Sequence, residues 1–186
     1  MGSLTIKKTG FNGLYIIKSN PHYDDRGAFG RLFCKEELRQ ANIEFDIVQI
    51  NYSFSKLQGT TRGLHFQHPP FCEDKIVRCL RGKVLDIVVD IRKDSSTFLQ
   101  CLTIELSKEN NLSLLIPKGF AHGFQTLEDN TELLYLHSQY YNKKYEGGLN
   151  ISDPVLSIQL PLSIKEISQR DKEFSYINSS FQGIEI

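Results

Sequence analysis

The sequence predicts an all-β protein, arranged as an antiparallel sandwich or barrel. Two observations lead to this fold class. Short segments rich in Val, Ile, Leu, Phe and Tyr follow one another, and clusters of Gly, Pro, Asn and Asp separate them. No internal repeat, low-complexity segment or linker divides the 186 residues, which are enough for one domain with a substantial core. We therefore expect a single domain over residues 1–186.

The first part of the chain gives one predicted strand and one predicted helix. The strand covers 13–18 and is broken by Asn20-Pro21 and by the turn sequence Asp24-Asp25-Arg26-Gly27. The helix covers 34–41, where most residues are good helix formers.

The rest of the chain is mostly strand by the same criteria. Arg81-Gly82 separates two apolar runs and predicts a hairpin turn between them. The segment after Pro154 is less regular, and 163–174 is charged and predicted to hold a turn or two of helix. The predicted strands are 45–53, 75–80, 83–92, 102–106, 112–116, 120–124 and 132–139.

A jelly roll is an attractive arrangement of these strands. Two sheets of alternating residues enclose a lumen, so inward-facing polar side chains from several strands converge on one ligand. Leu133 and Tyr135 are two apart and share a strand face, as do Lys75 and Val77. His65 also lies in a strand-like stretch with apolar neighbours.

Composition excludes some classes of protein. Lys plus Arg number 22 and Asp plus Glu number 22, so the formal net charge is zero. A nucleic-acid-binding protein usually has a strong basic excess, although a few local cations still suffice for a small anionic ligand. No apolar run approaches a membrane span, and the N-terminus lacks an apolar signal core, so we expect a cytoplasmic protein.

The cysteines indicate neither a zinc site nor a redox motif. Cys34, Cys72, Cys79 and Cys101 are scattered, and the nearest pair is too far apart for a two-residue gap. We expect all of them to be reduced and mostly buried.

Four residues along the chain supply the groups needed to remove and return a proton beside a ketone. His65 offers a base whose pKa is close to the working pH, and Asp171 a carboxylate that orients it. Lys75 offers a compact cation for the enolate oxygen, and Tyr135 a phenol that returns the proton from the other face. Taken singly, each has an ordinary alternative: a core histidine, a charge at a strand edge, an aromatic inside a barrel, or an acid in a charged tail.

A metal site is the main alternative chemistry for a barrel. Such barrels often use two closely spaced histidines, a glutamate and a distant histidine. His65 and His68 are three apart, so on a strand they point to opposite faces, and Glu73 follows only after Pro69-Pro70. The spacing therefore argues against a metal.

Several segments carry a family resemblance in order and in spacing, from about Gly13 to Asp171. The segments are Asp25-Arg-Gly-Ala-Phe29, Val48-Gln-Ile-Asn51, Arg62-Gly-Leu-His-Phe-Gln67, Lys75-Ile-Val-Arg-Cys79, Val89-Asp-Ile-Arg92, Ile116-Pro-Lys-Gly-Phe-Ala-His-Gly-Phe124, Asp153-Pro154 and Ser168-Gln-Arg-Asp171. In these segments the chain resembles the dTDP-4-dehydrorhamnose 3,5-epimerase family, and the third and sixth of them are specific to that family.

The resemblance implies a cupin-type double-stranded jelly roll with short peripheral helices, a homodimer, and no metal or redox cofactor. The substrate would be a nucleoside-diphosphate 4-keto-6-deoxyhexose, epimerised at C3, C5 or both to supply an activated deoxysugar. His65 matches the family's base, Asp171 its partner, Lys75 the cation and Tyr135 the acid. The residues that match ligand contacts, the first two of them expected to reach across the dimer, are Arg26, Phe29, Gln49, Asn51, Arg62, His122, Tyr141 and Glu146.

One departure from the family's pattern bears on the nucleotide. Many members that resemble this chain carry Glu two residues after the position of Phe29, where it accepts the thymine N–H. This chain has Arg31 there, and a guanidinium only donates hydrogen bonds, which suits a base such as cytosine. Ile50 and Tyr52 also replace the usual Asp and His.

Three rivals to the 3,5-epimerase prediction remain open at this stage. One is a single-centre epimerase, acting at C3 only or at C5 only, on a CDP-linked or other nucleotide sugar. Another is a non-catalytic barrel that binds a nucleotide sugar. The third is a metal-dependent barrel oxygenase or isomerase.

Overall fold

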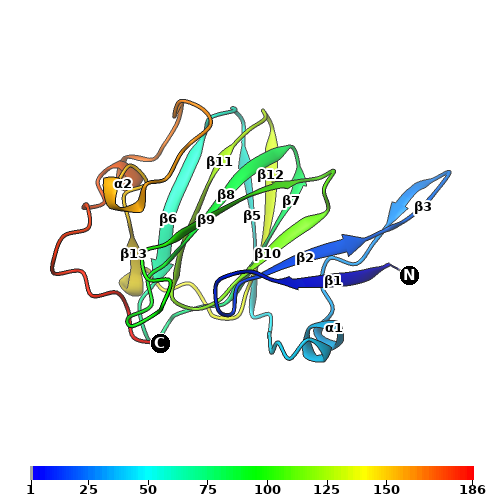
Figure 1. Ribbon diagram of the computed structural model, residues 1–186. Coiled ribbons are helices and arrows are strands. Elements are labelled where there is room, and N and C mark those ends of the chain that lie inside the picture. The colour runs from blue at the N-terminus through cyan, green and yellow to red at the C-terminus, as the bar shows by residue number, and fades with distance from the viewer. Residues whose placement is uncertain (1) are drawn as a thin grey trace.

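Two antiparallel sheets lie face to face in a computed structural model that describes residues 2–186 (Figure 1). The larger sheet has six strands in the order β1-β2-β10-β7-β12-β5, and the smaller has five in the order β13-β6-β11-β8-β9. This is a jelly roll of the cupin type, and the predicted fold class is confirmed. In chain order the strands of the sandwich are β1 (Ser3–Lys8), β2 (Tyr15–Asn20), β5 (Gln49–Ser55), β6 (Thr61–Gln67), β7 (Lys75–Arg81), β8 (Lys83–Asp90), β9 (Cys101–Ser107), β10 (Leu112–Ile116), β11 (Phe120–Thr126), β12 (Thr131–His137) and β13 (Glu146–Gly148).

The peripheral elements are short. A hairpin of β3 (His22–Asp24) and β4 (Gly27–Phe29) extends away from the sandwich beyond the end of β2 (Figure 1). The helices are α1 (Lys35–Gln40) and α2 (Gln169–Lys172), and the 3₁₀ turns are η1 (Lys143–Tyr145) and η2 (Pro154–Leu156). No helix among residues 2–186 is long and apolar enough to cross a membrane.

An apolar core fills one part of the space between the sheets. Val77 and Leu133 come from the larger sheet, Val84 and Phe124 come from the smaller one, and all are buried. Tyr135 packs against the edge of this cluster. The core therefore closes one part of the lumen and leaves the part beside Tyr135 for polar side chains.

Two further apolar clusters cover the outer faces of the sheets. On the larger sheet, Leu38 of α1 is fully buried together with Phe45, Ile76 and Leu136. Glu36 and Glu37 in the first turn of α1 and Arg39 in its last turn complement the helix dipole. On the smaller sheet, residues from the C-terminal third, such as Leu149 and Ile184, cover β6, β8 and β11. This packing brings the C-terminal segment and α2 alongside β6 (Figure 1).

The structure corrects the predicted hairpin at Arg81-Gly82. Strands β7 and β8 belong to different sheets, so this turn carries the chain across the sandwich and does not pair its two neighbours. Gly82 has a φ of +71°, and a Cβ there would lie 2.5 Å from Oγ1 of Thr131. A turn signal reports a change of chain direction, but the strand pairing depends on which sheet buries each strand.

Other differences concern the first third of the chain. The predicted strand 45–53 begins only at Gln49, because Phe45 instead packs into the cluster beneath α1. The predicted break after Asn20 contains the hairpin β3–β4, and β1 was not predicted. The predicted helices at 34–41 and within 163–174 are present as α1 and α2. The cysteines are free, with Cys72 and Cys79 buried and the other two half-buried.

A glycine in β6 sets the position of the neighbouring histidine. Gly63 has a φ of +98°, and a Cβ on it would lie 2.6 Å from the carbonyl oxygen of His122 on β11. The pairing of β6 with β11 shifts register between His122 and Phe124, directly opposite this point. Only glycine allows both the backbone conformation and the close approach.

Substitution of Gly63 by Ala is therefore expected to destabilise the protein. The positive φ and the contact with β11 together predict a loss of about 2 kcal/mol or more in the free energy of unfolding. Urea unfolding compares Gly63→Ala with Gly10→Ala, whose Cβ would meet nothing within 4 Å and whose φ is not positive. Equal stability of the two variants would contradict the assigned constraint.

Candidate active site

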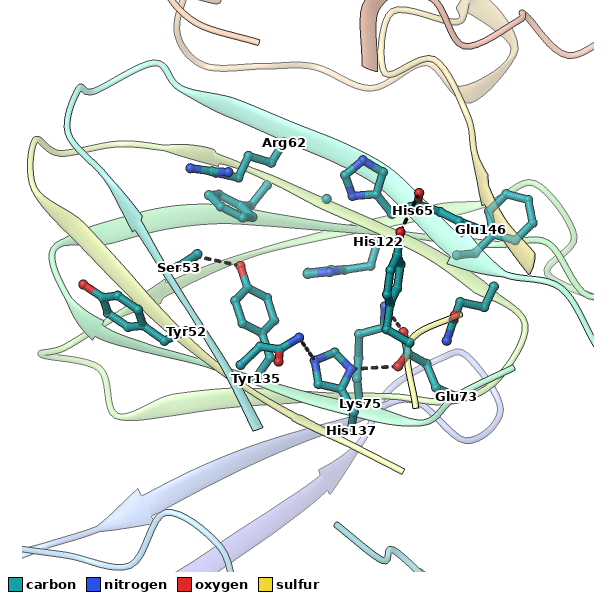
Figure 2. Close-up of a pocket in the computed structure, with 16 residues that line it drawn as sticks. Tyr52, Ser53, Arg62, His65, Glu73, Lys75, His122, Tyr135, His137 and Glu146 are labelled. Atoms are coloured by element: carbon teal, nitrogen blue, oxygen red, sulfur yellow. Dashed lines mark hydrogen bonds and ion pairs between the residues drawn. The ribbon is translucent and has the colours of Figure 1, made fainter. Parts of the chain in front are cut away.

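A polar cavity of about 300 Å³ occupies the remaining part of the lumen (Figure 2). Its walls come from both sheets, with His65 and Arg62 on β6 facing Tyr135 and His137 on β12 (Figure 2). On β12 the alternation explains the selection, because Tyr135 and His137 are two apart and point to the same side. On β6, Arg62 and His65 are three apart, on either side of the irregular pairing with β11 at Gly63. The remaining lining residues are Asn51, Tyr52, Ser53, Phe66, Gln67, Glu73, Lys75, His122, Gly123, Phe124, Tyr141 and Glu146.

A histidine–carboxylate pair forms part of the β6 wall. Nε2 of His65 lies 2.8 Å from Oδ1 of Asp171, and Oδ2 of Asp171 accepts the backbone N–H of Gly63 at 2.9 Å. Ser168 caps α2 and accepts the backbone N–H of Asp171, which fixes the carboxylate at the sheet. With Nε2 donating to Asp171, Nδ1 of His65 is the nitrogen that takes a proton.

The pairing with His65 keeps the carboxyl group of Asp171 ionised. Burial raises the pKa of a carboxyl group, but the hydrogen bonds from His65 and from the Gly63 backbone outweigh it and lower the pKa of Asp171 to about 2. The side chain of Asp171 is only 3% exposed. A buried carboxylate of this kind orients the imidazole and stabilises it once it is protonated.

Arg170 also approaches His65. Its Nη2 lies 2.9 Å from the same Nε2 that pairs with Asp171, and its Nη1 lies 2.8 Å from Oε2 of Glu146. One ring nitrogen cannot donate to Asp171 and accept from Arg170 at once. Arg170 is half-exposed and pairs with the carboxylates of Glu146 and Asp171, whereas Asp171 is buried against His65, so we assign the hydrogen on Nε2 to the bond with Asp171.

A second network of charges lies at the base of Tyr135. Nζ of Lys75 is 3.0 Å from Oε1 of Glu73, and Nδ1 of His137 is 2.7 Å from Oε2 of the same carboxylate (Figure 2). Burial raises the pKa of Glu73, but the ammonium of Lys75 and the hydrogen bond from His137 outweigh it and hold the pKa below its ordinary value. Glu73 is therefore ionised at neutral pH.

Tyr135 is a partly buried phenol whose hydroxyl contacts one other hydroxyl. Its Oη lies 3.1 Å from Oγ of Ser53 on the neighbouring strand β5. Burial raises the pKa of Tyr135 above its ordinary value, so the phenol is fully protonated at neutral pH. Tyr135 is thereby kept in the form that donates a proton.

Two further residues matched by the family resemblance line the cavity on β6 and β11. Arg62 is exposed and donates from Nη2 to the backbone carbonyl of Phe54 at 3.2 Å. His122 is buried, and its Nε2 lies 2.9 Å from Oδ1 of Asp86. Arg62 is placed to attract an anionic group at the cavity mouth.

The structure separates the remaining predicted contacts into two groups. Asn51, Tyr141 and Glu146 line the cavity, and Gln49 lies behind Asn51, to which its Nε2 donates at 3.0 Å. Arg26 and Phe29 lie outside the cavity on the exposed hairpin β3–β4, where Arg26 pairs with Asp24. Arg31 pairs with Glu37 on α1 and also lies outside the cavity. The ligand contacts of these residues stay predictions.

Several cavity groups were not among the predicted site residues. His137 lies two residues beyond Tyr135, and Ser53 two residues beyond Asn51, so the strand period carried a signal for both. Glu73 was considered only as a metal ligand, and it precedes β7, so the strand period does not reach it. Arg170 carried no comparable signal. Among residues 2–186, no group of three or more His, Cys, Asp or Glu side chains is arranged to hold a metal ion.

Comparison with known proteins gives a consistent result. The family model described as dTDP-4-dehydrorhamnose 3,5-epimerase matches residues 8–179. The dTDP-4-dehydrorhamnose 3,5-epimerase of Salmonella typhimurium is 40% identical over 172 residues, which cover 90% of this chain and 92% of that protein.

Solved structures of similar proteins superpose over most of the chain. A crystal structure of dTDP-4-dehydrorhamnose 3,5-epimerase from Bacillus anthracis, with TDP and PPi bound, has a TM-score of 0.92 at 35% identity and covers 94% of this chain and 100% of that one. A 3'-monoepimerase from Streptomyces bikiniensis in complex with dTDP-quinovose has a TM-score of 0.85 at 32% identity, covering 90% and 85% of the two chains.

The lowered pKa of Asp171 predicts a specific acid sensitivity. A carboxyl group with a lowered folded-state pKa contributes stability above its unfolded pKa and loses it as the pH falls toward the folded value. Since the pKa of Asp171 falls from 3.8 to about 2, we expect Asp171 to contribute about 2 kcal/mol at pH 7 and to lose it between about pH 5 and pH 2.

Asp171→Asn should therefore be less stable at pH 7 and show a shallower decline below pH 5. Chemical denaturation from pH 7 to pH 3 measures both effects. Asp94→Asn is the control, because Asp94 is exposed and its positive φ of 62° suits asparagine. Parallel stability profiles for Asp171→Asn and the wild type would contradict the assigned linkage.

Proposed function

Because the chain belongs to the dTDP-4-dehydrorhamnose 3,5-epimerase family, we propose that it inverts C3, C5 or both of a dTDP-linked 4-keto-6-deoxyhexose. Members of this family are isomerases, and the product would supply an activated deoxysugar for polysaccharide or another glycosylated product. The observation that carries the proposal is the cavity, in which the His65–Asp171 pair on one wall faces Lys75 and Tyr135 on the other.

His65 acts as the base in this mechanism. The hydrogen next to the C4 ketone is acidic because its loss gives an enolate, and Nδ1 of His65 accepts that proton. Asp171 keeps the imidazole in the tautomer with hydrogen on Nε2 and stabilises the imidazolium that results. The proton on His65 then exchanges with solvent, so deuterium enters the substrate in heavy water.

Lys75 and Tyr135 act from the opposite wall. The ammonium of Lys75 lies beside the developing negative charge on the C4 oxygen. Tyr135 delivers a proton to the opposite face of the enolate, which inverts the carbon, and water afterwards restores the phenol. Ser53 holds the Tyr135 hydroxyl in place through their 3.1 Å contact.

The nucleotide is proposed to be dTDP. The Bacillus anthracis relative contains TDP, and the Streptomyces bikiniensis relative contains dTDP-quinovose. The guanidinium of Arg31 pairs with Glu37 in this chain, and this weakens the predicted preference for cytosine. Arg62 at the cavity mouth is the proposed contact for the diphosphate.

We propose that the active protein is a homodimer. Strand β5 is the edge of the larger sheet, and Ile50, Tyr52 and Phe54 expose apolar surface at alternate positions along it. The hairpin β3–β4 projects away from the sandwich with Tyr23 and Phe29 exposed (Figure 1). A second copy that covers β5 explains both surfaces, and Arg26 and Phe29 would then complete the nucleotide site of the other copy.

We also propose that residues 1–186 act as a single epimerase domain in the cytoplasm. The apolar cluster between the sheets is shared by both sheets and favours one folding unit. A nucleotide-sugar substrate is a cytoplasmic metabolite class, which favours that compartment.

A single-centre epimerase is the second candidate, favoured by the similarity to the 3'-monoepimerase of Streptomyces bikiniensis. Deprotonation at C3 and at C5 gives two different enolates that carry their charge on the same C4 oxygen. One base and one cation can therefore serve both carbons, and the residues of the cavity are compatible with both reactions. The positions at which deuterium enters the sugar distinguish them.

Replacement of His65 should abolish the exchange. We expect His65→Ala to lower deuterium incorporation at C3 and C5 of dTDP-4-keto-6-deoxyglucose in heavy water by at least about 100-fold, followed by NMR. His68→Ala is the matched control, since His68 lies three residues further along and outside the cavity. Full exchange with His65→Ala would show that another group is the base.

Replacement of Tyr135 should separate exchange from inversion. Tyr135→Phe keeps the base and the enolate site but removes the proton donor on the opposite face. We expect deuterium exchange to continue while formation of the inverted sugar falls on the order of 100-fold. Normal inversion by this variant would assign the second proton to water.

A charge on β5 should separate the dimer. Ile50→Lys places an ammonium in the apolar patch, so we expect a monomer by light scattering and a loss of epimerase activity. Val155→Lys is the control, because Val155 is equally apolar and 52% exposed but lies on η2, away from β5. A dimer that survives Ile50→Lys would place the interface elsewhere.

A further inference from the structure

Lys75, the cation of the proposed mechanism, has a carboxylate beside it that offsets its charge. The ammonium of Lys75 lies 3.0 Å from Glu73, and their side chains are 9% and 11% exposed. A carboxylate this close cancels much of the field of the ammonium at any point further away. It also repels the negative charge that develops on the C4 oxygen. Lys75 and Glu73 together are therefore a weak partner for an enolate.

His137 is the third member of this group. Its Nδ1 lies 2.7 Å from Oε2 of Glu73, within the range of charge-assisted hydrogen bonds, and its side chain is 11% exposed. On its other side, Nε2 lies 3.3 Å from Nδ2 of Asn51. The mechanism proposed above uses neither His137 nor Glu73.

The hydrogen bonds around His137 run in one direction. Gln49 accepts from the backbone N–H of Tyr141 and donates to Oδ1 of Asn51, whose Nδ2 then faces Nε2 of His137. Nδ1–H of His137 donates to Glu73, which also accepts from Lys75. In this arrangement Nε2 carries a lone pair, so the imidazole is neutral. The group of Lys75, Glu73 and His137 then has a net charge of zero, and protonation of Nε2 makes it +1.

The surroundings of His137 favour this change. Glu73 precedes β7, Lys75 is on β7, and Tyr135 is on β12 with its ring stacked on His137 at a centroid distance of 6.1 Å. Asn51 on β5 is uncharged, and rotation of its amide would present Oδ1 to a protonated Nε2 in exchange for the hydrogen bond from Gln49. The other titratable groups around the cavity are Tyr52, Arg62, His65, His122, Tyr141 and Glu146.

We propose that His137 is a positioning residue that takes up a proton from solvent when the enolate forms, so that Lys75 acts as a net cation. This inference rests on the function proposed above. The proton enters at Nε2 of His137 and returns to solvent when the enolate is protonated, so the reaction needs no other reactant. Glu73 couples His137 to Lys75, because its carboxylate contacts both the imidazole and the ammonium.

The proposal gives the pH profile a defined shape. His65 must be neutral to accept a proton, so kcat rises with pH on the acid side of the profile. His137 must be protonated, so kcat falls again on the alkaline side. The alkaline limb of the profile is therefore assigned to His137.

Three variants test the assignment by deuterium exchange and inversion over pH 5–10. His137→Gln keeps a hydrogen-bonding side chain without the charge, and we expect kcat to fall roughly 10- to 100-fold with the alkaline limb lost and KM little changed. Glu73→Gln in the same chain removes the opposing carboxylate. The double variant Glu73→Gln/His137→Gln leaves Lys75 as a lone cation. We expect its kcat to be at least about tenfold higher than that of His137→Gln. His68→Gln, outside the cavity, is the control.

Recovery in the double variant separates a charge effect from a structural one, because two changes to a structural network would add their damage. An additive or larger loss, or an unchanged alkaline limb in His137→Gln, would overturn the proposal. ¹⁵N NMR of the His137 imidazole gives a readout that needs no substrate. We expect Glu73→Gln to lower its protonation midpoint by at least about one pH unit, and an unmoved midpoint would overturn the coupling. Absence of exchange in the wild type would instead refute the proposed function, and the NMR titration would still decide the coupling.

Discussion

The contact between Asp171 and strand β6 is the interaction on which the rest of the site depends. One carboxylate binds Nε2 of His65 and the backbone N–H of Gly63, and so joins α2 to the smaller sheet. The approach of β6 to β11 at Gly63 is possible only because that residue has no side chain. The bulge, the helix and the imidazole are therefore held by a single buried charge. The C-terminal segment, which looks irregular in sequence, thereby supports the β6 wall of the cavity from outside.

The lumen of the jelly roll divides into an apolar part and a charged part, and Tyr135 lies at the boundary. The apolar part provides the stability that allows charged groups to be buried in the other part. Two buried carboxylates in and beside the cavity have cationic or imidazole partners: His65 for Asp171, and Lys75 with His137 for Glu73. These pairings satisfy the charges, and they also lower the pKa of both carboxyl groups so that they remain ionised.

The two histidine–carboxylate pairs face each other across the space where a sugar ring would lie. In the proposed mechanism one of them removes the proton and the other adjusts the charge of the opposite wall. In such a cavity His65 and His137 can each gain a proton in turn. The net charge of the cavity and the substrate together then changes by no more than one unit. In that mechanism a lysine paired with a glutamate can still stabilise an enolate.

The sequence by itself determined the fold class and most of the strands, because the alternation of apolar residues and the turn residues between them are local properties. It also identified His65, Lys75 and Tyr135, which line one cavity, and Asp171, which binds His65. Only the tertiary structure decided that β7 and β8 lie in different sheets, since strand pairing depends on long-range burial. The tertiary structure likewise revealed the roles of Glu73 and His137, 64 residues apart, because a strand's period specifies which face a side chain occupies but not which residue it meets there.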